Sequence, residues 1–199
     1  FTFYNWFRFH IDINGIHSLR GEVIRPASRN HEFKFINILF LFLYVIPPLK
    51  YDYFQKGMKI NSQGITVTET HIIQFAELTG DYNPIHMDDE FSKSTIFGVR
   101  ISHGLLTTSL GLGLFFQLVM GTVIALLEVN VKFLKPVKVG DTIHTETEVI
   151  DKKESDKYNG GVVTFEHRIK NQAGEEVAIA ETKLLISNEL VTKENVIRH

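Results

Sequence analysis

Alternating apolar and polar residues fill the C-terminal part of the chain in four long segments, roughly 121–134, 141–153, 157–171 and 174–188. A period of two residues is typical of β-strands with one buried face. Turn-forming residues separate the segments, so the pattern predicts an antiparallel meander rather than alternating βαβ units. A shorter alternating segment, 63–68, predicts one further strand.

Two helices are predicted ahead of the four long strands. The first runs from a cap at Thr68 or Thr70 to Gly80. Its apolar side chains are expected to face inward: Ile72, Ile73, Phe75, Ala76 and Leu78. The second, Leu105–Met120, is apolar or small on all sides, as in a helix buried at the centre of a domain. Because nothing else is large enough to cover it, the sheet must wrap it, which predicts a single α+β domain.

The segment 80–86 between the helices places the carboxylate of Asp81 and the imidazole of His86 five residues apart. Pro84 lacks an N–H and disfavours the α conformation at Asn83, so we expect an irregular, stiffened loop here. The two side chains can then face one another, and the carboxylate would orient the ring and stabilise its cationic form. We therefore expect a general acid/base pair, the alternative being an ordinary turn with His86 on the surface.

A second candidate site is Ser102-His103-Gly104, which begins the central helix. A helix N-terminus presents unpaired N–H groups and a positive dipole end. Gly104 allows close approach, and its N–H is predicted to polarise a carbonyl oxygen as in an oxyanion hole. For the side chains of Ser102 and His103 we favour a simple N-cap and core packing. An irregular stretch through Phe97 and Gly98 is a candidate lid.

Two other kinds of site are weaker alternatives. A metal centre would use His86, Asp88 and His103 as ligands, but no compact His-x-x-x-His pair supports it. A hydrolase would use Ser102 as nucleophile, but no Gly-x-Ser-x-Gly motif surrounds it. Inside the central helix, Gly111 and Gly113 are expected to let the sheet approach closely, or to leave room for a ligand chain.

Composition narrows the classes of function. With 199 residues, of which 44% are hydrophobic, the chain can bury one substantial core. A formal net charge of -2 with no basic cluster argues against nucleic acid and against an anionic membrane surface as partners. The chain has no cysteine, which excludes a disulfide framework, a cysteine nucleophile and thiolate-bound zinc. It suits a reducing compartment, and we expect a cytoplasmic protein.

The residues before Met58 show neither a helical nor an alternating period. Their apolar run Phe35–Ile46 has about 12 residues, fewer than the roughly 20 that span a bilayer, so no stable membrane insertion is expected. Because Lys56-Gly57 directly precedes Met58, a translated ribosome-binding sequence is our interpretation, and an interfacial anchor or targeting extension is the alternative. The predicted organisation is a non-native, poorly structured segment 1–57, a domain 58–189 and a mobile tail 190–199.

Three motifs together resemble the MaoC-like (R)-specific enoyl-CoA hydratases and acyl dehydratases. They are Gly80-Asp81-x-Asn83-Pro84-x-His86-x-Asp88, Ser102-His103-Gly104 and Phe133-x-x-Pro136-x-x-x-Gly140-Asp141. The resemblance covers roughly residues 60–188 and implies a hotdog fold, an antiparallel sheet wrapped around a long central α-helix. It also implies reversible hydration of trans-2-enoyl-CoA to (R)-3-hydroxyacyl-CoA. Dehydration of 3-hydroxyacyl groups on acyl carrier protein, a thioesterase and a non-catalytic acyl-thioester binding module remain alternatives.

The resemblance implies a role for each matching residue. Asp81 and His86 would activate water and handle the proton, and the Gly104 N–H would hold the thioester oxygen. The remaining residues would bind substrate or shape the site: Asn83, Phe97, Gly98, Ser102 and His103. Leu112 stands where some members have a serine, so one hydroxyl contact is missing.

The resemblance further implies coenzyme A as the substrate carrier, with no metal or redox cofactor. A single domain of this shape leaves a sheet edge and one side of the helix incompletely covered. Pairing with a second copy would cover both, so we expect a homodimer.

Overall fold

The computed structural model describes residues 47–192 and 194. The chain divides into two units, Phe1–Tyr44 and Val45–His199, and all described residues belong to the second. The predictions for residues 1–46, and for positions 193 and 195–199 of the predicted tail, therefore lie outside the described residues.

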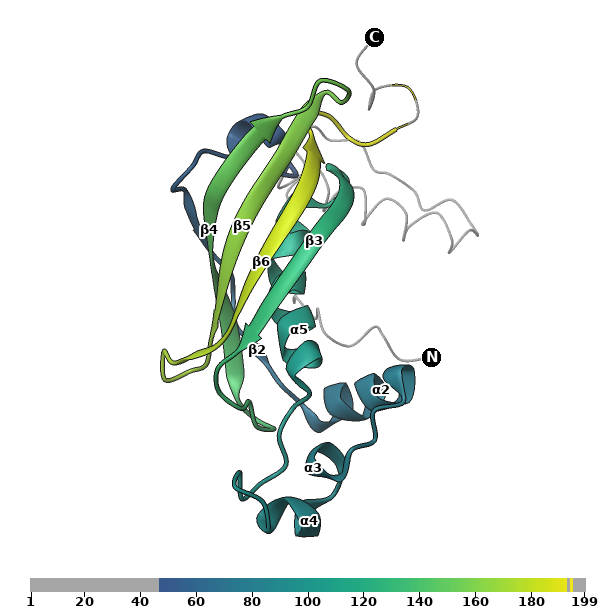
Figure 1. Ribbon diagram of the computed structural model, residues 1–199, viewed down its shortest axis with the longest axis vertical. Helices are drawn as coiled ribbons and strands as arrows, with labels where there is room; N and C mark the ends of the chain where they lie inside the picture. Colours follow the sequence, from purple (N-terminus) through teal and green to yellow (C-terminus); the bar gives the residue numbers. More distant parts are fainter. Residues whose placement is uncertain (1–46, 193, 195–199) are drawn as a thin grey trace, which may run out of the picture. The chain divides into compact units, whose positions relative to one another are not determined.

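The second unit contains an antiparallel sheet with one long helix, α5, lying against it, and α2, α3 and α4 lie together at one end of the sheet (Figure 1). In chain order the elements are the 3-10 turn η2 (Tyr51–Tyr53), β1 (Lys59–Asn61), β2 (Ile65–Thr66), α2 (Glu69–Thr79), α3 (Pro84–Met87), α4 (Asp89–Lys93), α5 (Gly104–Phe116), the 3-10 turn η3 (Gln117–Val119), β3 (Val123–Phe133), β4 (Thr142–Glu154), β5 (Gly160–Lys170) and β6 (Glu176–Ser187). The four long strands lie where the alternating pattern predicted them. Among these described helices, none combines the length and the apolar character needed to cross a bilayer.

The strands follow the order β1-β4-β5-β6-β3 in the sheet, with β2 paired to β4 beside this path. The predicted meander is correct for β4, β5 and β6, which pair in sequence. It is wrong for β3, which pairs with β6 at the far edge. The residues after β3 make no tight hairpin, because Val137 and Lys138 pair instead with the segment before α5 through Ser102 and Ile101.

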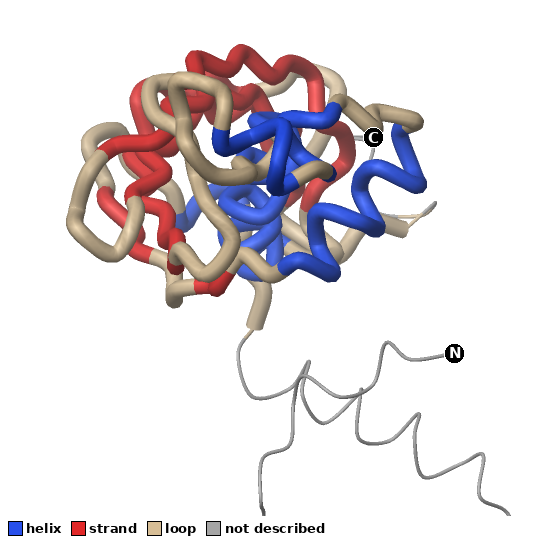
Figure 2. The backbone as a smooth tube through the Cα atoms, turned by 90° about the horizontal axis from the view of Figure 1, so that it is seen from below, coloured by secondary structure: helices blue, strands red, loops and turns tan. Residues whose placement is uncertain are grey.

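Helix α5 lies against one face of this sheet (Figure 1), and the strands are curved (Figure 2). A Cβ atom added to Gly111 would lie 2.7 Å from Cδ1 of Ile169, and the Thr145 hydroxyl donates a hydrogen bond to the Gly111 carbonyl at 3.0 Å. The close approach expected at Gly111 is thus confirmed, whereas a Cβ on Gly113 would meet nothing within 4 Å. An antiparallel sheet wrapped around a central helix is the predicted hotdog fold.

Helix α2 begins and ends as the sequence predicted. Thr68 accepts a hydrogen bond from the His71 N–H in a capping box, and Gly80 ends the helix with a φ of 77°. Of the side chains predicted to face inward, Ile72 is buried but Leu78 is 85% exposed and Ile73 is 38% exposed. The prediction for Leu78 and Ile73 is wrong because α2 lies outside the sheet and buries only one narrow face.

Residues just before Met58 belong to the hydrophobic core. Phe54 is fully buried, and its ring meets that of Phe165 edge-on with centroids 5.1 Å apart. Tyr51 is buried in the same cluster, and the Gly57 N–H donates to the Val149 carbonyl at 2.8 Å. The packed domain therefore begins before Met58, the residue at which we predicted it to start. The origin of residues 1–57 stays a prediction.

The core also contains a titratable group, His167, which is fully buried. Its Nδ1 lies 2.8 Å from the Thr147 hydroxyl and its Nε2 lies 2.9 Å from the Thr182 hydroxyl. Both nitrogens are therefore satisfied while the ring is neutral. Burial lowers the pKa of His167 from 6.5 to about 3, because a cationic ring here would lose its hydration.

This pKa makes stability pH-dependent. Between pH 6.5 and about 3 the unfolded chain binds the His167 proton more readily than the folded chain. The contribution of neutral His167 to the free energy of unfolding is therefore complete above pH 6.5. It falls by up to about 1.4 kcal/mol per pH unit as the pH drops from 6.5 to about 3. Urea unfolding across this range should show a smaller pH slope in His167→Asn than in the wild type. Equal slopes would contradict the assignment.

Candidate active site

The two predicted motifs meet at the N-terminal end of α5, around a cavity of about 430 Å³. Six of the predicted site residues line it: Asp81, His86, Phe97, Ser102, His103 and Gly104. Much of the remaining wall is apolar, with Phe75, Ile101, Leu105, Phe133, Leu134 and Val137. Asn83 and Gly98 do not line the cavity, so the structure does not support direct substrate contacts for these two.

Asn83 instead shapes the segment that carries His86. Pro84 begins α3 rather than a loop, so the predicted break extends only as far as Asn83. The reason is that the first position of a helix needs no N–H, which suits proline. The Asn83 side chain caps α3 by accepting from the Ile85 N–H at 3.3 Å, and the Asp81 carboxylate accepts from the Asn83 N–H at 3.3 Å. A contact between Asn83 and a reacting water stays a prediction.

The ring of His86 is oriented by a main-chain carbonyl. Its Nδ1 lies 2.8 Å from the carbonyl oxygen of Ile101, so in the neutral ring Nδ1 carries the hydrogen and Nε2 is the free base. The structure corrects the prediction that Asp81 orients this ring. The carboxylate of Asp81 is close, since a carboxylate oxygen and one nitrogen of each of His86 and His103 all lie within 4.8 Å of one another.

His103 connects the two motifs from the buried side. Its Nε2 lies 2.9 Å from the carbonyl oxygen of Asp81, to which it donates. Its ring packs on that of His86, with centroids 3.9 Å apart, and on that of Phe75, with centroids 5.0 Å apart. Its Nδ1 is buried and has no hydrogen-bond partner among the described residues. His103 thus packs and hydrogen-bonds in the core, as we favoured.

Ser102 is not the predicted N-cap. The residue in the N-cap position of α5 is His103, whose side chain makes no capping hydrogen bond. Ser102 is buried, and its hydroxyl accepts a hydrogen bond from the Thr107 hydroxyl at 3.1 Å. The cavity wall therefore carries the hydroxyl groups of Ser102, which precedes α5 in the chain, and of Thr107, which lies within α5.

The environment of His86 favours the neutral ring. Burial is the largest influence and lowers its pKa below 6.5, and the nearby ring of His103 lowers it further. The Ile101 carbonyl and the Asp81 carboxylate act in the opposite direction without reversing the result. At neutral pH His86 therefore presents an unprotonated Nε2 and can act as a base.

Gly104 lines the cavity and is the first residue of α5. The first N–H groups of a helix have no acceptor within the helix, so this amide is available to an oxygen atom. A Cβ atom on Gly104 would lie 2.8 Å from the ring of Phe133, which explains why glycine fits here. Phe133 is 52% exposed and forms part of the wall over the amide.

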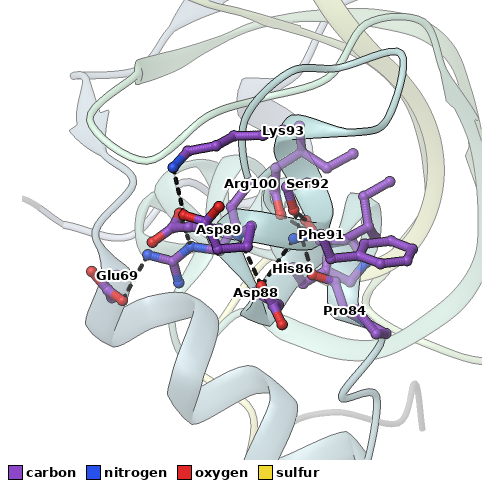
Figure 3. Close-up of polar contacts among 12 residues, drawn as sticks. Glu69, Pro84, His86, Asp88, Asp89, Phe91, Ser92, Lys93 and Arg100 are labelled. Atoms are coloured by element: carbon purple, nitrogen blue, oxygen red, sulfur yellow. Dashed lines mark hydrogen bonds and ion pairs between the residues drawn. The ribbon is translucent and has the colours of Figure 1, made fainter.

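The predicted alternative metal set is not assembled. The carboxylate of Asp88 accepts hydrogen bonds from the N–H groups of Glu90 and Phe91 at 2.9 and 3.0 Å, and so caps α4 (Figure 3). The compact set contains Asp81 in place of Asp88, together with His86 and His103. Two histidines and a carboxylate are common metal ligands. However, Nε2 of His103 already donates a hydrogen bond to the Asp81 carbonyl, so it has no free electron pair for a metal ion.

A protein-family model described as the MaoC like domain matches residues 54–171. The chain belongs to the MaoC-like domain family. A 3-hydroxybutyryl-CoA dehydratase from Methylorubrum extorquens is 31% identical over 110 residues, which are 54% of this chain and 69% of that protein. An (R)-specific enoyl-CoA hydratase from Aeromonas caviae is 36% identical over 103 residues, 52% of this chain and 74% of the relative.

A solved structure has a similar fold. The monoamine oxidase regulatory protein from Archaeoglobus fulgius superposes with a TM-score of 0.65 at 42% identity, covering 71% of this chain and 96% of that one.

Within this MaoC-like domain, Leu112 is buried in α5 and does not line the cavity. The hydroxyls at the cavity come instead from Ser102 and Thr107, near the start of the helix.

Sequence reasoning missed the Ile101 carbonyl, the ring of Phe133 and the Thr107 hydroxyl. The Ile101 carbonyl had no sequence signal, because every residue carries a main-chain carbonyl. Phe133 did have one, since it opens the third motif, but the motif does not indicate that its ring lies against Gly104.

Proposed function

We propose that this chain is an (R)-specific enoyl-CoA hydratase, which reversibly hydrates trans-2-enoyl-CoA to (R)-3-hydroxyacyl-CoA. One observation carries the proposal: a neutral imidazole, a carboxylate and a helix-start amide border the same largely apolar cavity. This combination suits the addition of water next to a polarised carbonyl. The relatives named (R)-specific enoyl-CoA hydratase support the substrate class and the stereochemistry.

The reaction assigns one task to each group. Asp81 and Nε2 of His86 bind a water molecule, and Nε2 accepts its proton as the water oxygen bonds to C3. The electron pair of the C2–C3 double bond shifts toward the thioester, whose oxygen gains negative charge and accepts a hydrogen bond from the Gly104 N–H. His86 then returns the proton to C2 and the carbonyl re-forms. One water is added, and the reverse sequence removes it.

No metal or redox cofactor is required by this chemistry. The thioester carbonyl already makes C3 electrophilic, and the oxidation level of the substrate as a whole does not change. Coenzyme A is then the substrate carrier rather than a cofactor. A cytoplasmic location and the lack of nucleic-acid partners stay predictions.

Two other functions use the same cavity differently. Dehydration of 3-hydroxyacyl groups on acyl carrier protein is the reverse chemistry on another carrier, and relatives named dehydratase keep it open. A non-catalytic acyl-thioester binding module would need the cavity but not the acid/base pair of Asp81 and His86. The fixed Nδ1–H tautomer of His86, which exposes a free base, favours catalysis over binding.

The direct test is hydration of crotonyl-CoA, followed by loss of the enoyl absorbance and chiral analysis of the product. We expect turnover to the (R) isomer, and a loss of on the order of 10²–10⁴ in kcat/KM in Asp81→Asn and in His86→Ala. Asp151→Asn and His144→Ala replace the same residue types on β4 and should retain wild-type rates.

Other outcomes would reject the assignment. Unchanged rates in both site variants would remove the hydratase mechanism. No turnover by the wild type with crotonyl-CoA or longer enoyl-CoA, but turnover of acyl carrier protein thioesters, would favour the dehydratase. Binding of acyl thioesters without turnover on either carrier would favour the binding module.

We further propose a homodimer that pairs through β3. This strand has a hydrogen-bonded neighbour, β6, along one edge only among the described strands. It carries exposed apolar side chains, including Leu126, Leu127 and Val129. A long apolar edge strand favours pairing with another chain, and a second copy is the simplest partner.

Sedimentation of the full chain at micromolar concentration should therefore give twice the monomer mass. Leu127→Lys, which adds a charge to the β3 edge, should shift the protein toward monomer. Leu78→Lys is the matched control, because Leu78 is an exposed leucine on α2 rather than on β3. A wild-type monomer, or equal mass in the wild type and Leu127→Lys, would contradict the proposed interface.

A further inference from the structure

Arg100 holds two helices together from a largely buried position. Its Nε lies 2.7 Å from Oδ1 of Asp89 in α4, and its Nη2 lies 2.9 Å from Oε1 of Glu69 in α2 (Figure 3). The Arg100 side chain is only 13% exposed, although both carboxylates are more open to solvent. A guanidinium presents several donors in a fixed plane, so these two bonds fix the side chain in direction as well as in distance.

The next residue in the chain is the one that orients the catalytic imidazole. The carbonyl of Ile101 accepts the hydrogen bond from Nδ1 of His86 at 2.8 Å, and its N–H donates to the Ile85 carbonyl at 3.2 Å. Ile101 also forms a β-bridge with Lys138. A single peptide bond therefore separates Arg100, which makes the ionic contacts to α2 and α4, from Ile101, whose carbonyl selects the tautomer of His86.

We propose that Arg100 is a positioning residue: by tying α2 to α4 it fixes the Ile101 carbonyl and so keeps His86 in the Nδ1–H tautomer with Nε2 free. Only the kinetic consequence rests on the proposed hydratase function. The positioning itself concerns the geometry of the free protein.

A second ion pair in the same region provides a matched comparison. Lys93 and Glu90 lie 2.6 Å apart within α4, and their side chains are 62% and 84% exposed. An exposed pair inside one helix turn contributes little and holds no second element. Within the described part of the chain, Lys93 pairs with Glu90 and has no hydrogen bond or ion pair with Arg100 or Ile101. Its removal tests whether any lost cation near α4 has the same effect.

Loss of the Arg100 contacts has a defined effect on His86. When the Ile101 carbonyl is free to shift, Nδ1 loses its acceptor and both neutral tautomers become populated. The cationic ring also loses a hydrogen bond that stabilises it, so the pKa of His86 falls. The other titratable groups that face the ring, Asp81 and His103, are unchanged by the substitution. A purely structural role for Arg100 would change neither property.

The test is nitrogen NMR of the full chain with labelled histidine, with His86→Ala used to assign the His86 signals. The wild type should show a protonated Nδ1 and an unprotonated Nε2 at neutral pH. In Arg100→Met the two chemical shifts should move toward each other, and the titration midpoint of His86 should fall below that of the wild type. Arg100→Lys retains the charge but not the two-donor geometry and should lie between them, whereas Lys93→Met should match the wild type.

Kinetics add a second readout. With crotonyl-CoA, Arg100→Met should lower kcat about tenfold with KM within about twofold, because a misplaced base affects the chemical step. Wild-type His86 signals in a folded Arg100→Met protein would overturn the proposal, as would equal effects of Lys93→Met. If Arg100→Met fails to fold, Glu69→Gln and Asp89→Asn each remove one contact, and wild-type His86 signals in both would overturn it. Absence of hydration by the wild type would reject the proposed function and leave the NMR result to decide the role of Arg100.

Discussion

The packing of α5 against the curved sheet is the constraint on which the site depends. At Gly111 the helix lies so close to the sheet that a single Cβ atom would collide with Ile169, and the Thr145 hydroxyl binds the helix backbone there. The contacts at Gly111 therefore fix the position of α5 near the middle of the helix. Its N-terminus, with the Gly104 amide, is consequently held at the edge of the sheet, where the α2–α4 region covers it and encloses a cavity.

Two main-chain carbonyls then set the histidines of the site. The Ile101 carbonyl accepts from His86, and the Asp81 carbonyl accepts from His103. The two rings lie in contact, with centroids 3.9 Å apart and planes tilted by 32°. The free nitrogen of His86 is therefore specified by backbone geometry rather than by a carboxylate, and of the two Asp81 oxygens only Oδ1 accepts a hydrogen bond, from the Asn83 N–H, among the described residues. Two residues outside the cavity adjoin this arrangement, because Asn83 caps the helix that carries His86 and Arg100 precedes Ile101 in the chain.

The sequence indicated those parts of the structure that depend on local patterns. A period of two located the four long strands, and Thr68 and Gly80 marked the ends of α2 because capping acts within one helix turn. It did not indicate that β3 pairs with β6, since that choice depends on contacts between residues far apart in the chain. The spacing of Asp81 and His86 marked the candidate site. Their orientation could not be predicted, because it depends on a main-chain atom fifteen residues from His86 and on the ring of His103.

The central claim is that neutral His86 is the base that activates water. The most direct measurement is the pH dependence of kcat/KM for crotonyl-CoA hydration. Protonation of Nε2 removes the base, so the rate should fall on the acid side with a midpoint below 6.5, the ordinary pKa of histidine. A profile with no acid limb, or with a midpoint above 6.5, would contradict the account.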